Sequence, residues 1–105
     1  GETWDEDSAW LAAWRAPPKR ALEILEPFDT QPCLHLKGFL LHHTGETDQA
    51  LDKFQESLRQ NLVSLYARAG LAWSSYIKGE PQYRELARKV LEKWPLEPTC
   101  RWLLG

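Results

Sequence analysis

Residues 34–61 read LHLKGFLLHHTGETDQALDKFQESLRQN, and their apolar residues recur with the period of two α-helices. Leu34, Gly38 and Leu41 follow an i, i+4, i+7 spacing, which places them on one face of a first helix. Gly45 comes next, and glycine is the residue best able to adopt the positive φ that ends many helices. The segment therefore predicts two antiparallel helices joined by a tight turn.

The second half of this segment carries small and aromatic residues at matching positions. Ala50, Phe54 and Ser57 recur at i, i+4 and i+7. The small Ala50 and Ser57 allow two helices to approach closely, and Phe54 can fill the space between them. Together with the first helix, this pattern resembles the tetratricopeptide (TPR) repeat, whose hairpin combines an L-G-x2-Y-like first helix with A-x3-F in the second.

The spacing of two glycines at expected helix ends supports the resemblance. Gly45 and Gly79 each precede a glutamate and are 34 residues apart, which is the TPR period. The resemblance implies an all-α fold, a TPR-like right-handed stack of three antiparallel helical hairpins in a single domain covering residues 1–105. We expect the hairpins at about residues 5–27, 33–61 and 62–95, with a short capping helix within residues 96–105. The flanking hairpins follow the pattern less closely, as terminal repeats commonly do.

Prolines and glycines set the expected ends of the helices, since proline fits a first helical turn and stops a preceding helix. The expected helices cover residues 5–15, 18–26, 33–44, 48–60, 62–78, 81–94 and 98–104. No segment has the alternation of apolar and polar residues that is typical of a strand.

The composition limits the classes of partner. A net charge of −2 and a pI near 5.9 provide no basic surface for nucleic acid, and no apolar run is long enough to span a membrane. The acidic N-terminus is unlike a signal peptide, so a cytoplasmic location is the default expectation. Cys33 and Cys100 are expected to be free thiols in that reducing compartment. The lack of methionine suggests a processed protein or a domain excised from a longer chain.

The resemblance also implies where a partner would bind. In TPR proteins the first helix of each hairpin lines a concave groove, which usually holds a peptide or helix of another protein. When the apolar faces of the expected first helices are turned inward, a stripe of aromatic and histidine residues remains for the groove. The predicted groove residues are Trp10, Trp14, His35, Phe39, His42, Tyr66, Trp73 and Tyr76.

An aromatic groove with few charges suits an apolar anchor on a partner, because tryptophan and tyrosine dominate binding hot spots. The alternative is that several of these tryptophans belong to the core. The groove positions lack the lysine, asparagine and arginine of the TPR clamp for chaperone C-termini, so that specificity is not expected.

Metal binding and catalysis have little support. His35 and His42 are about 10 Å apart along a helix axis, too far to share one ion, and we expect no metal or cofactor. The chain has no glycine-rich phosphate loop, no nucleophile elbow and no paired carboxylates in an apolar setting, so we expect no enzyme activity.

The sequence therefore predicts a protein-binding adaptor, monomeric or a weak homodimer, that takes up a peptide or helix in an aromatic groove. One alternative is a structural domain that associates with itself or stacks within a longer repeat protein. A second is a small-molecule or sugar pocket lined by tryptophans.

Overall fold

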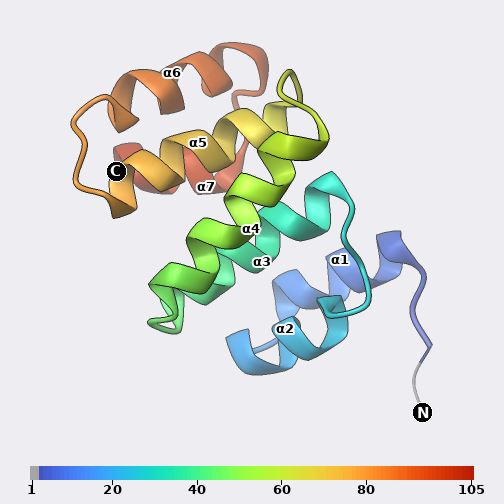
Figure 1. Cartoon of the computed structure of the whole chain (residues 1–105). Coiled ribbons are helices and arrows are strands. Elements are labelled where there is room, and N and C mark those ends of the chain that lie inside the picture. The colour runs from blue at the N-terminus through green and yellow to red at the C-terminus, as the bar shows by residue number, and fades with distance from the viewer. Residues whose placement is uncertain (1–2) are drawn as a thin grey trace.

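The computed structural model describes residues 3–105, and this part of the chain is helical without strands, which confirms the predicted all-α class. The helices, coloured from blue to red in Figure 1, are α1 (Glu6–Arg15), α2 (Pro18–Leu25), α3 (Gln31–His43), α4 (Thr47–Gln60), α5 (Leu65–Ile77), α6 (Tyr83–Lys93) and α7 (Pro98–Leu104).

The helices form two rows (Figure 1). Helices α1, α3, α5 and α7 make one row, since each packs against the next. Helices α2, α4 and α6 make the other row, and each packs against the odd-numbered helices before and after it. The result is an elongated molecule of 43 × 27 × 27 Å.

Three predicted helix starts are wrong by two or three residues. Helix α3 begins two residues early, because Pro32 is well accommodated in its first turn. Helix α5 begins at Leu65 instead of residue 62, because the Ser64 side chain caps it by accepting a hydrogen bond of 3.1 Å from the backbone N–H of Tyr66. Helix α6 begins at Tyr83 instead of residue 81, after a turn.

Gly45 and Gly79 end α3 and α5 with φ of +86° and +75°. At the first of these ends, the N–H of Glu46 donates to the carbonyl of Leu41 over 2.8 Å. This geometry satisfies carbonyl groups that the helix leaves without partners, and it needs a residue that tolerates positive φ.

Gly45→Ala and Gly79→Ala are each expected to lower the free energy of unfolding by about 1 kcal/mol, because the left-handed conformation costs an L-residue that much. A new Cβ would meet nothing within 4 Å at either position, so conformation alone causes the loss. Urea unfolding measures it. Asparagine, which tolerates this conformation, is the control and should lose less. Alanine variants as stable as the parent chain would contradict the assignment of these helix ends.

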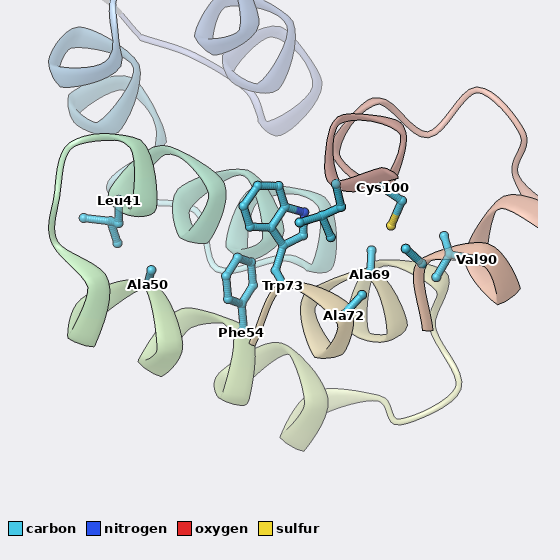
Figure 2. Packing of buried hydrophobic residues seen from close by; sticks show 10 residues of the cluster. Leu41, Ala50, Phe54, Ala69, Ala72, Trp73, Val90 and Cys100 are labelled. Atoms are coloured by element: carbon cyan, nitrogen blue, oxygen red, sulfur yellow. The ribbon is translucent and has the colours of Figure 1, made fainter. Parts of the chain in front are cut away.

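The core lies between the two rows of helices. Figure 2 shows one cluster in which Phe54 of α4 and Trp73 of α5, both fully buried, lie among side chains from α3 to α7. A Cβ added at Gly38 of α3 would lie only 2.4 Å from Cε1 of Phe54, and one at Gly70 of α5 would lie 3.0 Å from Cδ1. Phe54 therefore fills the space between helices, as predicted, and glycine is what lets α3 approach it.

Candidate partner-binding site

A line of aromatic rings crosses the row of odd-numbered helices. The ring centroids of Trp10 and Trp14 in α1 are 5.9 Å apart, and Trp14 lies 5.9 Å from Phe39 in α3. Phe39 is 4.4 Å from His43, which is 5.2 Å from Trp102 in α7. We call these five residues the aromatic strip. His43 and Trp102 are exposed and the other three are partly buried, so the strip is accessible along its length.

Six of the eight predicted groove residues are partly exposed: Trp10, Trp14, Phe39, His42, Tyr66 and Tyr76. The placement of the other two in an open groove is wrong. Trp73 has no exposed surface and His35 is 3% exposed.

Both corrections have the same cause, which is the position of α7. The Trp102 ring stacks on Trp73 with centroids 5.3 Å apart and an angle of 28° between the planes. Thr99, at the start of α7, contacts His35 through its hydroxyl group. Helix α7 packs on α5 and α6 and so covers the last hairpin as expected, but it also reaches α3 through the contact between Thr99 and His35.

His43 and Trp102 belong to the strip but were not predicted as site residues. His43 follows Phe39 at i+4, so the helical period contained a signal for it. No comparable signal existed for Trp102, because its place depends on how α7 folds back onto α3 and α5.

The strip carries little charge at neutral pH. Burial lowers the pKa of His42, and burial together with the neighbouring His42 lowers the pKa of His43. Both imidazoles are therefore neutral near pH 7, and the face offers aromatic surface with few fixed charges.

Beneath α7, three polar side chains form a buried cluster. The Thr99 hydroxyl donates to Oε2 of Glu97 over 2.7 Å, so it accepts the 2.8 Å hydrogen bond from Nε2 of His35. This places the proton of the neutral imidazole on Nε2 and leaves Nδ1 buried without a hydrogen-bond partner. Glu97 also accepts from the backbone N–H groups of Thr99 and Cys100 and so caps α7.

The three residue types of this cluster also occur in nucleophilic active sites. Here the His35 and Glu97 side chains are 3% and 2% exposed, and Thr99 has no exposed surface. A substrate therefore has no path to the hydroxyl group. The cluster ties α7 to α3 and is structural in character.

This cluster predicts a loss of stability in mild acid. Burial lowers the pKa of His35 from 6.5 to about 4, and the Glu97 carboxylate 3.9 Å away only partly opposes that shift. The unfolded chain therefore binds more protons between pH 6.5 and 4, so stability is retained above pH 6.5 and falls as the pH drops through this window. The full loss is of the order of 3 kcal/mol.

Urea unfolding of the parent chain and His35→Gln at several pH values measures this effect, because contributions from carboxylates common to both proteins cancel in the difference. The amount by which the free energy of unfolding of the parent chain exceeds that of the variant should decrease as the pH falls from 6.5 to 4. A difference that is constant over this range would show that His35 does not titrate as described.

A small cavity of about 290 Å³ adjoins the α1 end of the strip. It lies between α1 and the first turns of α3 and α5. Among residues 3–105, those that line the cavity are Glu6, Asp7, Trp10, Leu11, Pro32 and Tyr66. Two of the predicted groove residues, Trp10 and Tyr66, therefore face a common hollow.

Within residues 3–105, no three or more histidine, cysteine or acidic side chains are grouped so that they could hold a metal ion. Over the same residues, none of the helices has the length and apolar character needed to cross a membrane. No family model matches the chain, and neither a curated protein nor a solved structure is significantly similar to it.

Proposed function

We propose that the chain is a protein-interaction module that binds a peptide or helix of a partner along the aromatic strip. The observation that carries the proposal is the continuity of the strip from α1 through α3 to α7, with accessible rings on each helix. Aromatic rings supply large contact areas at a low cost in side-chain entropy, and they dominate the energetics of protein interfaces.

We further propose that the two rows correspond to a TPR-like stack. The order of packing supports this, because the odd-numbered helices contact one another in sequence and the even-numbered helices lie behind them. In such a stack the odd-numbered helices are the first helices of the hairpins. The strip lies on that row, where the TPR resemblance implies a binding groove.

The strip favours binding over catalysis as its role. Its rings can contact apolar anchors of a partner, and His43 of the strip, like the neighbouring His42, is a neutral hydrogen-bonding group at pH 7. The buried Thr99 hydroxyl, a potential nucleophile, is sealed beneath α7. We therefore assign the strip no chemical step.

Selection of peptides from a random displayed library tests the proposal. Selected peptides should bind the parent chain and should bind a His43→Ala, Trp102→Ala double variant at least tenfold more weakly, since hot-spot truncations cost about 2 kcal/mol or more. The matched control is Leu62→Ala, Val63→Ala, which removes two exposed apolar side chains in the turn between α4 and α5. Affinity lost in the control and kept in the strip variant would refute the proposal. Circular dichroism verifies that both variants are folded.

A second candidate function is self-association, as in a domain that stacks on a copy of itself. It is favoured by Leu62 and Val63, each 72% exposed, and by Leu96, which is 73% exposed. Sedimentation equilibrium distinguishes the two candidates. A mass that rises with concentration and falls back in a Leu62→Ser, Val63→Ser variant would support self-association through the turn.

A further inference from the structure

We propose that the cavity between α1, α3 and α5 receives an arginine side chain of the partner peptide. This inference rests on the proposed function and names a chemical requirement of the partner. The strip accounts for apolar anchors, whereas the cavity at its α1 end has a different chemistry.

The walls of the cavity combine aromatic surface with negative charge. Trp10 and Tyr66 contribute rings, and Leu11 and Pro32 contribute aliphatic surface. Of the residues within 3–105 that line the cavity, Glu6 and Asp7 are charged, and both are acidic. An organic cation is attracted both to the faces of aromatic rings and to carboxylates, so this lining is complementary to a positively charged group with an apolar stem.

The N-cap of α1 is Asp5, so neither Glu6 nor Asp7 is needed for the capping hydrogen bond. Asp5 caps α1 by accepting a hydrogen bond of 2.8 Å from the N–H of Ser8. The carboxylates of Glu6 and Asp7 are one and two residues further on and border the cavity.

A third carboxylate acts on the wall from inside the protein. Burial raises the pKa of Tyr66, and the buried Glu97 adds to that rise. The Glu97 carboxylate behind Tyr66 therefore adds to the negative charge of the two acidic residues that line the cavity.

The cavity has room for a long side chain. Pockets for drug-sized molecules are about 300–1,000 Å³, so about 290 Å³ lies at the lower limit. Trp10 belongs both to the cavity and to the strip, so a peptide lying along the strip would reach the cavity at its end.

Arginine fits this lining better than lysine. Its planar guanidinium group stacks on aromatic rings, forms paired hydrogen bonds with carboxylates and is more weakly hydrated than an ammonium group. The occupant is therefore expected to be arginine, inserted between the rings and the two acidic side chains.

Titration of the ¹⁵N-labelled full chain with N-acetyl-arginine methylamide tests this inference directly. The indole N–H signal of Trp10 should shift and saturate, with a dissociation constant of about 1–10 mM, as suits a single side chain. The citrulline analogue, which has nearly the same shape without the charge, should bind at least tenfold more weakly. Equal binding of citrulline or of the lysine analogue, or no saturable shift with arginine, would overturn the assignment.

The matched variants are Glu6→Gln, Asp7→Asn at the cavity and Asp52→Asn, Glu92→Gln on the even-numbered row, which change the net charge equally. The cavity variant should weaken arginine binding at least tenfold, whereas the control should change it less than twofold. A larger loss of arginine binding in the control than in the cavity variant would refute the cavity site.

Library peptides separate this inference from the proposed function. Peptides selected on the parent chain should have arginine at one fixed position, and that preference should disappear on the Glu6→Gln, Asp7→Asn variant. Peptides that depend on the strip but show no arginine preference would refute the cavity site and leave the proposed function standing. Saturable arginine binding without any strip-dependent peptide would support the cavity site and refute the proposed function.

Discussion

Trp73→Ala is expected to lower the free energy of unfolding by about 3–5 kcal/mol, the usual cost of truncating a buried tryptophan. Trp73 has no exposed surface, and its ring lies 5.2 Å from Phe39, 6.5 Å from Phe54 and 5.3 Å from Trp102, between centroids. The substitution therefore opens a cavity where α3, α4, α5 and α7 meet. Domains of this size are commonly stable by about 5–15 kcal/mol, so much of the fold's stability would be lost.

Urea unfolding monitored by circular dichroism measures this loss, and two variants provide the comparison. Trp102→Ala should cost less, because Trp102 is already 49% exposed. Trp73→Phe should also cost less, because the indole N–H of Trp73 is buried without a hydrogen-bond partner and its removal relieves that penalty. A Trp73→Ala variant within 1 kcal/mol of the parent chain would show that Trp73 is not in the core.

Gly38→Ala is expected to lower the free energy of unfolding by about 1–3 kcal/mol, although alanine normally stabilises a helix by about 1 kcal/mol over glycine. The added Cβ would lie 2.4 Å from Cε1, 2.7 Å from Cζ and 2.8 Å from Cδ1 of Phe54. Because Phe54 is itself fully buried, relief requires α3 to move away from α4.

A double-mutant cycle with Phe54→Leu isolates this contact. Leucine lacks two of the three ring carbons that the new Cβ would meet, so Gly38→Ala should become neutral or stabilising in that background. Gly70→Ala is the control with a weaker clash. It should cost less stability, since the nearest atom to its new Cβ, Cδ1 of Phe54, would be 3.0 Å away. The same loss from Gly38→Ala with either residue at position 54 would contradict the proposed packing.

The parts of the fold that the sequence predicts are those determined by local spacing. Gly38 and Phe54 revealed the α3–α4 hairpin because close helix packing needs a small residue opposite a large one. Gly45 and Gly79 marked helix ends because few other residues adopt positive φ. Helix starts were less accurate, since they depended on single side chains such as the Ser64 cap.

The candidate site was predictable only in part, for a reason that lies in α7. The helical period alone aligned His35, Phe39 and His42 on one stripe of α3, but it carries no information on what covers the stripe. The hydrogen bond from His35 to Thr99 joins residues 64 positions apart in the sequence. Contacts of that range depend on the tertiary fold, so burial of His35 could not be inferred from either segment alone.

The position of α7 also changes how the predicted groove is understood. Trp102 of α7 covers Trp73 and also forms one end of the aromatic strip. This short helix therefore fills part of the predicted groove and adds exposed aromatic surface of its own. The hydrogen bonds that Glu97 accepts from Thr99 and Cys100 stabilise the start of this helix. A partner is thus expected to bind across α1 and α3 and to contact the exposed Trp102 ring of α7.

The most direct test of the account is a map of the backbone N–H signals and the six indole N–H signals of the ¹⁵N-labelled chain as a library-selected peptide is added. We predict shifts for Trp10, Trp14 and Trp102, which belong to the strip, and little change for Trp4, which lines a cavity beside α2. Changes confined to Trp4 and to the backbone of α4 and α6 would place binding on the other row and contradict the central claim.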